Sequence, residues 1–150
     1  NIGKSTFINS YARKAAAKTG NKPGVTKGKQ WIRLGKNLEL LDTPGILWPK
    51  FENQKVGLYL AAIGSIRSEI LEQRELSFEV ITLLKELYPG RMSEKYGVDE
   101  SADEPDILYQ MAANRNCLKA GGEPDDERVA TMFLDDFKNG RLGKISIERP

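Results

Sequence analysis

The sequence predicts an α/β segment followed by an all-α helical domain. Three observations lead to this fold class: Gly3-Lys4-Ser5 opens a helical pattern, an apolar strand ends at Asp42, and apolar residues recur at helical spacing after residue 53. We therefore assign residues 1–53 to a partial α/β sheet and residues 54–150 to a helical C-terminal domain. A length of 150 residues suits one medium domain or two small ones.

The composition excludes several classes of site. Cys117 is the single cysteine and the chain has no histidine, which excludes an internal disulfide, a Cys/His catalytic pair and a His-ligated zinc site. A lone cysteine fits a reducing compartment, so we expect a cytoplasmic protein. The sequence shows no apolar run near the length of a membrane span and no signal-peptide pattern at its start. Any metal is expected to be a hard cation held by oxygen atoms.

Charge is distributed unevenly along the chain, although the net charge is only +2. Residues 1–50 carry a net charge of +8, whereas residues 51–150 carry −6. Such a basic segment attracts polyanions, so nucleotide, RNA or both are candidate ligands. The alternative is that these lysines and arginines lie on solvated loops and have no partner.

The first helix is expected from Lys4 to about Tyr11, where Phe7 and Ile8 begin the helical spacing. The next segment, residues 15–27, contains two glycines and a proline and reads as a long loop.

A β-hairpin is expected next, with a first strand at 30–34, a turn at 35–37 and a second strand at 38–41 that ends at Asp42. The second strand is mostly apolar, which predicts burial on both faces. Trp31, on the first strand, is expected to pack in the core.

The start of the first helix carries the end of a phosphate-binding motif. Gly3-Lys4-Ser5 matches the last part of G-x-x-x-x-G-K-[ST], whose first glycine would stand two places before Asn1. Gly3 lets backbone N–H groups close around phosphate oxygens, Lys4 can reach the β- and γ-phosphates, and the Ser5 hydroxyl can ligate Mg²⁺. The helix that follows points its positive end at the same phosphates.

A second motif, Asp42-Thr43-Pro44-Gly45, follows the second strand. A carboxylate at a strand end can hold Mg²⁺, and the Gly45 N–H can bind a γ-phosphate. The alternative is a plain Pro-Gly turn. Thr26, in the preceding loop, is the candidate for a further Mg²⁺ ligand, with Thr19 as a weaker rival.

The remainder of the chain reads as helical. Apolar residues follow helical spacing at 56–63, 80–88, 107–111 and 130–137, and the second of these stretches ends at Pro89-Gly90. The segment at 142–148 alternates weakly, as an extended segment would. Cys117 is expected to pack as a small apolar residue. Trp48 is the better of the two tryptophans for stacking on bases. Five basic residues are candidates for a cluster that binds RNA: Lys119, Arg128, Lys138, Arg141 and Lys144. The alternative is that they are scattered, solvated charges.

Together, "NIGKSTFIN", "AKTGNKPGVTKGKQW" and "LELLDTPGILWPKF" resemble the circularly permuted ribosome-assembly GTPases. The resemblance continues through "LKELYPGRMSEKYG" and "NRNCLKAGG" and covers nearly the whole chain. It implies that the sheet is a partial P-loop GTPase sheet whose guanine-reading motifs precede Asn1, so that this chain is the C-terminal half of a GTPase. The run at 21–24, "NKPG", departs from Asn-Lys-x-Asp because its last residue has no carboxylate.

The resemblance further implies GTP and Mg²⁺ as ligands and the large ribosomal subunit and its rRNA as partners, with no DNA. The implied nucleotide contacts are Asn1, Ile2, Gly3, Lys4, Ser5, Thr6 and Gly45, and the implied Mg²⁺ ligands are Ser5, Thr26 and Asp42. Asn1 corresponds to an asparagine that helps hold K⁺ in related GTPases; the alternative is that it has no such role here. Ile46 stands where other GTPases have a water-orienting glutamine, so the catalytic group is unknown.

Two alternatives to a GTP-hydrolysing assembly factor remain open. The chain could be an RNA- or protein-binding module with an inert, incomplete nucleotide site. An ATP-using P-loop enzyme is also compatible with the two motifs, because neither of them reads the base.

Overall fold

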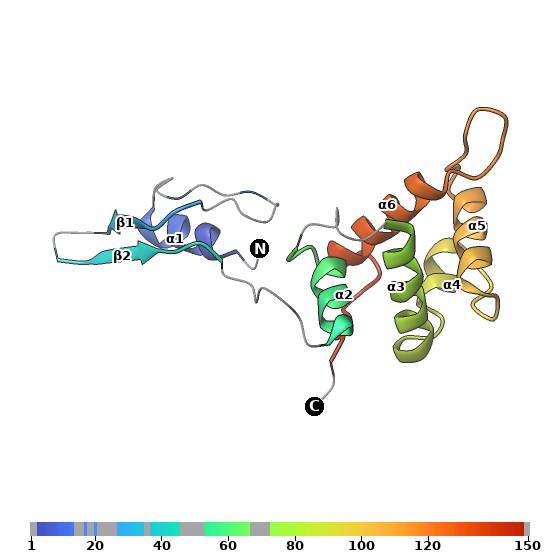
Figure 1. The fold of residues 1–150 in the computed structure, drawn as a ribbon, viewed down its shortest axis with the longest axis horizontal. Helices are drawn as coiled ribbons and strands as arrows, with labels where there is room; N and C mark the ends of the chain where they lie inside the picture. The colour runs from blue at the N-terminus through green and yellow to red at the C-terminus, as the bar shows by residue number, and fades with distance from the viewer. Residues whose placement is uncertain are drawn as a thin grey trace.

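The structure is a computed structural model that describes residues 3–13, 17, 20, 27–34, 37–45, 53–66 and 73–148. Within these ranges a helix and two strands precede five further helices, so the predicted fold class is confirmed (Figure 1). The elements are α1 (Lys4–Ala12), β1 (Gln30–Arg33), β2 (Glu39–Asp42), α2 (Gln54–Ala62), α3 (Gln73–Leu87), α4 (Arg91–Tyr96), α5 (Glu104–Asn114) and α6 (Asp126–Lys138).

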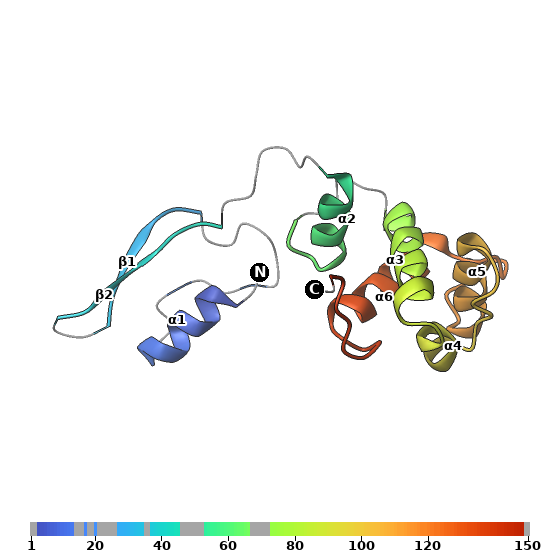
Figure 2. The ribbon, with the colours of Figure 1, turned by 90° about the horizontal axis from the view of Figure 1, so that it is seen from below.

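The predicted hairpin is present, and α1 packs on one of its faces (Figures 1 and 2). Strands β1 and β2 pair antiparallel, so that alternate side chains point to opposite faces. Ile32 on β1 and Leu40 on β2 form a small cluster with Ile8 of α1. The same alternation sends Trp31 and Leu41 to the second face.

The second face of the hairpin is uncovered among the described residues. Trp31 is 69% exposed and Leu41 39% exposed. The prediction that Trp31 packs in a core is therefore wrong for this structure, and so is the prediction that the second strand is buried on both faces. The physical reason is that α1 covers one face, and no other described element packs against the hairpin.

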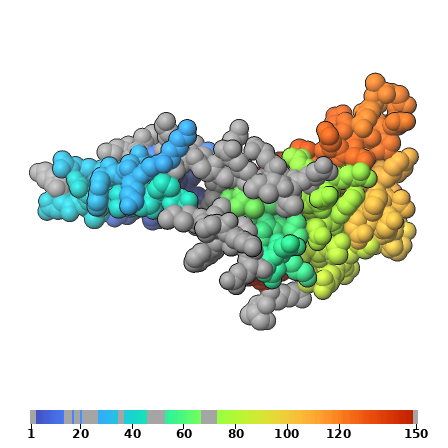
Figure 3. Space-filling view, viewed as in Figure 1, coloured from blue at the N-terminus to red at the C-terminus, as the bar shows by residue number. Residues whose placement is uncertain are grey.

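The helical domain has a separate core, which α3 and α6 dominate. The stripes predicted at 80–88 and 130–137 supply fully buried side chains such as Ile81, Leu84 and Phe133. Tyr96 of α4 meets the Phe133 ring edge-on at 6.0 Å between centroids. Cys117 is buried in the same core, as expected. In Figure 3 the surfaces of α2, α3 and α5 adjoin on one face of this domain.

Two helices differ from the sequence-based expectation, one in the residues that it buries and one in not having been predicted. The pattern at 56–63 correctly predicts a helix, but Val56 and Ile63 are exposed while Ala61 and Ala62 are buried. Pro89-Gly90 ends α3 as expected, yet a further short helix, α4, follows at once and was not predicted. Six residues are too few to show a hydrophobic period.

The segment at 142–148, expected to be extended, forms no strand in the described structure. Its backbone bonds to the side chain of Tyr88, the residue after α3: the Tyr88 hydroxyl accepts a hydrogen bond from the Ser146 N–H at 2.8 Å. The same hydroxyl lies 3.2 Å from the Ser146 carbonyl oxygen and can donate to it. The backbone of Ser146 therefore bonds to the Tyr88 side chain and not to a neighbouring strand.

Candidate functional site

The phosphate-binding motif lies at the N-terminus of α1. Gly3 is the N-cap residue and has a left-handed φ of 89°, which a side chain would disfavour. It supplies no side-chain cap to the helix, and the Phe7 N–H donates to its carbonyl at 2.8 Å. Helix α1 therefore begins at Lys4, with Ser5 and Thr6 in its first turn. A helix start of this kind is suited to an anion.

The loop after α1 is tied back to the helix by one amide. Asn9 donates from Nδ2 to the Ala17 carbonyl at 2.8 Å and accepts from the Ala17 N–H at 2.7 Å. Ala17 itself is buried in the cluster with Ile8 and Ile32. This two-point contact holds Ala17 against the helix that presents Lys4. No sequence pattern predicted this contact.

The carboxylate of Asp42 lies at the end of β2 and pairs with the ammonium of Lys4. Oδ1 of Asp42 accepts from Lys4 Nζ, so residues 38 positions apart in the chain meet in one site. The Asp42 side chain is completely buried, whereas that of Lys4 is 42% exposed. A buried carboxylate needs such a partner. The predicted convergence of the helix start and the strand end is therefore present in the structure.

A second donor on the same carboxylate was not predicted. Gln30 of β1 donates from Nε2 to Oδ2 of Asp42 at 3.3 Å. The backbone register places Gln30 directly opposite Asp42 across the hairpin. Counting outward from the expected turn at 35–37 would have paired these two positions, so the hairpin pattern carried the signal.

The residues that the structure describes fit a metal bound together with phosphates, but not a metal held by protein alone. Among them, no group of three or more Asp, Glu, Cys or His side chains could hold an ion. Asp42 offers one buried carboxylate, and Ser5 follows Lys4 in the first turn of α1. Mg²⁺ commonly takes one or two protein ligands and completes its shell with phosphate oxygens and water. The donor set agrees with that mode.

The other predicted site residues are only partly described. Gly45 is exposed, and a side chain built on it would meet nothing within 4 Å. Asn1, Ile2 and Thr26 lie outside the described residues, as do Thr19, Ile46 and Trp48. Their roles stay predictions.

The five basic residues considered for one cluster are divided among different surroundings. Arg141 binds Asp135 at 3.0 Å and Asp136 at 2.8 Å. Lys138 and Lys144 line a hollow of about 460 Å³ beside Ile63, whereas Arg128 lines a different hollow with three carboxylates. Lys119 is exposed. Arg128 and Arg141 therefore lie among carboxylates, apart from the hollow that Lys138 and Lys144 line.

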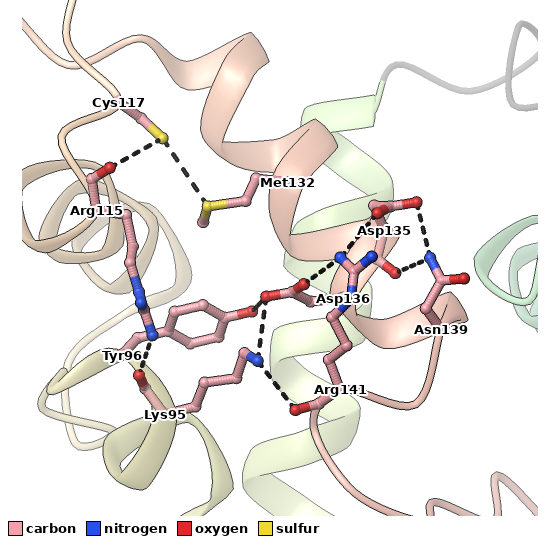
Figure 4. Close-up of polar contacts among 9 residues, drawn as sticks. All are labelled: Lys95, Tyr96, Arg115, Cys117, Met132, Asp135, Asp136, Asn139 and Arg141. Carbon is pink, nitrogen blue, oxygen red and sulfur yellow. Dashed lines mark hydrogen bonds and ion pairs between the residues drawn. The ribbon is translucent and has the colours of Figure 1, made fainter.

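A buried polar network joins α4 to the end of α6 (Figure 4). The Tyr96 hydroxyl donates to Asp136 Oδ2 at 2.9 Å, and Lys95 Nζ lies 3.4 Å from the same oxygen. Burial, the hydrogen bond to Asp136 and the charge of Asp136 all raise the pKa of Tyr96 well above its ordinary value. Burial acts to raise the pKa of Asp136, but Arg141, Tyr96 and Lys95 outweigh it and hold the pKa below its ordinary value. Tyr96 therefore stays a neutral donor to an ionised carboxylate.

The comparisons with known proteins agree on one kind of relative. A family model described as a 50S ribosome-binding GTPase matches residues 1–103. Ribosome biogenesis GTPase A of Bacillus cereus is 44% identical over 100% of this chain, which covers 51% of that relative. The protein of the same name from Thermotoga maritima is 35% identical over 100% of this chain, which covers 53% of it.

Solved structures agree with these relatives. YlqF from T. maritima bound to GNP superposes with a TM-score of 0.65 at 28% identity, covering 99% of this chain and 55% of that one. A GDP-bound structure of YlqF gives the same TM-score and identity and covers 100% of this chain and 57% of that one. This chain therefore spans about half the length of the curated relatives that it matches. No helix among the described residues has the length and apolar character that crossing a bilayer requires.

Proposed function

Because the chain belongs to the family of 50S ribosome-binding GTPases, we propose that the protein binds and hydrolyses GTP during late assembly of the large ribosomal subunit. The nucleotide state would control its binding to the subunit and its rRNA, in the cytoplasm. Family membership confirms the resemblance to ribosome-assembly GTPases that the motifs indicated. The circular permutation and the domain boundary at residue 53 stay predictions.

The observation that carries this proposal is the contact between Lys4 and Asp42. Lys4 comes from the phosphate-binding helix start and Asp42 from the end of a strand, and each is the charged residue of its own motif. In the proposed function Lys4 neutralises phosphate charge, while the backbone of residues 1–6 surrounds the phosphates. Bound Mg²⁺ supplies charge neutralisation for the β- and γ-phosphates. Ser5, Thr26 and Asp42 are its proposed ligands, and the family implies K⁺ at Asn1.

In this proposal Gly45 links the nucleotide state to ribosome binding. This glycine follows Asp42 by three residues, so its N–H is a candidate contact for the γ-phosphate. Loss of that phosphate would release the segment after β2. A segment that is ordered by the γ-phosphate and released on hydrolysis is a common two-state device in GTPases.

The first experiment measures GTP hydrolysis by the complete protein with and without purified large ribosomal subunits. Acceleration by the subunit is expected for the wild type, and Lys4→Ala should lower the rate by at least about 100-fold because a preorganised cation on the phosphates is lost. Lys55→Ala is the matched control, since that lysine lies in α2, outside the site. Full activity of Lys4→Ala, or the absence of any effect of large subunits, would contradict the proposal.

The inert binding module is the second candidate, and the uncovered face of the hairpin favours it for these 150 residues taken alone. With Trp31 and Leu41 exposed, the described sheet lacks the second layer that a complete nucleotide-binding domain has. Titration of the 150-residue segment with Mg²⁺-GTP distinguishes the two. Tight binding by the segment would eliminate the inert module, and ATP competition on the complete protein would decide the base.

A further inference from the structure

The two oxygens of the Asp42 carboxylate have different partners from different elements. Oδ1 accepts from Lys4 of α1, and Oδ2 accepts from Gln30 of β1 at 3.3 Å. Among the described residues, the two donors therefore reach the carboxylate from two sides. One donor is a cation on a long, 42% exposed side chain, and the other is a neutral amide.

The position of Gln30 is set by the hairpin and not by α1. Its Cα stands opposite that of Asp42 in the antiparallel register, so both side chains leave the sheet on the same face. A carboxylate can only accept hydrogen bonds, so the contacting atom of the amide must be its nitrogen. Pairing of β1 and β2 therefore keeps Gln30 within reach of Asp42, whether or not Lys4 moves.

The contact between Lys4 and Asp42, in contrast, can break when another anion competes for the Lys4 ammonium. Lys4 must reach the phosphates in the proposed function, and a single ammonium on a flexible stem can leave Oδ1 when phosphate oxygens compete for it. Once Lys4 leaves, a buried carboxylate that has lost its cation requires another positive charge. Oδ1 is then the oxygen without a protein partner among the described residues.

We propose that Gln30 is a positioning residue for the cation-binding carboxylate of Asp42. By holding Oδ2, it keeps Oδ1 directed at the place that Lys4 occupies in this structure, so that this oxygen can meet the cation of a bound metal–nucleotide. The proposal rests on the proposed function and adds a residue that neither motif contains. Gln30 touches neither phosphate nor metal in this account and acts only through Asp42.

The test uses the complete protein, a non-hydrolysable GTP analogue and Mn²⁺ as the probe, with bound Mn²⁺ measured by electron paramagnetic resonance. Gln30→Ala should weaken Mn²⁺ binding in the presence of the analogue by about tenfold, the low end for loss of a group that orients a metal ligand. Affinity for the analogue in EDTA should be unchanged, because Lys4 and the phosphate loop are intact.

Arg33→Ala is the matched control, because it removes a second polar side-chain pair between the same two strands. Arg33 Nε lies 3.1 Å from Glu39 Oε1, and this pair does not touch Asp42. Its Mn²⁺ affinity should equal that of the wild type. An equal loss in Arg33→Ala would assign the effect to strand pairing and overturn the proposal.

A double variant separates action through Asp42 from any direct role. In an Asp42→Asn background, Gln30→Ala should cause no further loss of Mn²⁺ affinity. Unchanged Mn²⁺ binding by Gln30→Ala, while the wild type binds Mn²⁺ and the analogue, would overturn this inference alone. Failure of the wild type to bind Mn²⁺ with the analogue would overturn the proposed function as well.

Discussion

At the scale of single residues, the site depends on a buried carboxylate that always needs a cation. Asp42 has Lys4 as that cation in the described structure. Breaking a buried pair by removing one partner is strongly unfavourable, whereas exchanging one cation for another is not. The pair therefore favours a coupled event, in which phosphate oxygens attract Lys4 as a metal cation reaches Asp42. Binding of the nucleotide and of the metal should accordingly be cooperative.

Asp136 gives a prediction of pH dependence at the same scale. Its pKa is held below the ordinary value in the folded state, so its contribution to stability is complete above the unfolded-state pKa and is lost as pH falls through the lowered folded-state pKa. The wild type should therefore lose stability as pH falls below about 4. Asp136→Asn should be less stable at neutral pH and should lose less stability on acidification, as measured by urea unfolding across this range.

The control for this prediction is Asp135→Asn. Asp135 also pairs with Arg141, but its side chain is 56% exposed, so the variant should differ little from the wild type. An acid profile of Asp136→Asn that parallels the wild-type profile would contradict the assignment.

The role of a residue could be predicted from the sequence when the residue belongs to a recognisable motif. It could not be predicted when the role depends on contacts that only the fold creates. Lys4 and Asp42 are named by their motifs, and the structure brings them together. Gln30 and Asp136 are polar residues whose partners become known only from strand register or helix packing. Asp136 stands three residues after the buried Phe133, so helical spacing placed it on the core side of α6. A polar residue in an apolar stripe was the one available signal.

At the scale of elements, α3 and α6 hold the helical domain together. Phe133→Ala in α6 should lower the free energy of unfolding by about 3–5 kcal/mol, because it removes a fully buried ring and leaves a cavity. Tyr109→Ala in α5 is the matched control: its side chain is 57% exposed, and the expected change is within about 0.5 kcal/mol. Denaturant unfolding followed by circular dichroism measures both. Equal effects of the two variants would contradict the assignment of the core.

Elements with a long period were predictable, and short or locally bonded ones were not. The thirteen residues of α6 and the fifteen of α3 show the helical period clearly. Helix α4 has six residues bounded by Gly90 and Gly97, so its sequence shows turn signals in place of a period. The segment at 142–148 alternates as a strand would, but its backbone bonds to Tyr88. Periodicity shows which side chains lie on the same face of an element, but not which other element or residue contacts that face.

At the scale of the whole molecule, the hairpin of β1 and β2 presents a face that a further layer of protein can cover. Trp31 and Leu41 are exposed beside each other in register, on a chain that spans about half the length of its curated relatives. The sequence correctly predicted that Trp31 lies on a strand, but not that its side chain is exposed. It could not show whether that face was covered, because the covering residues need not belong to these 150.

Trp31→Ala therefore tests the architecture of the complete protein. If segments outside this chain cover the second face, the variant should lower the free energy of unfolding of the complete protein by about 3–5 kcal/mol. A change within about 0.5 kcal/mol, as expected for Tyr109→Ala, would mean that Trp31 stays at the surface. Thermal and denaturant unfolding of the complete protein supply the measurement.

The most direct test of the account is a structure of the complete protein with Mg²⁺ and a non-hydrolysable GTP analogue. We expect Lys4 Nζ to lie about 3 Å from a phosphate oxygen, separated from Asp42, and the Asp42 carboxylate to be directed at the metal or at one of its waters. A structure in which the nucleotide is bound while Lys4 still pairs with Asp42, or in which the phosphates lie away from both residues, would contradict the central claim.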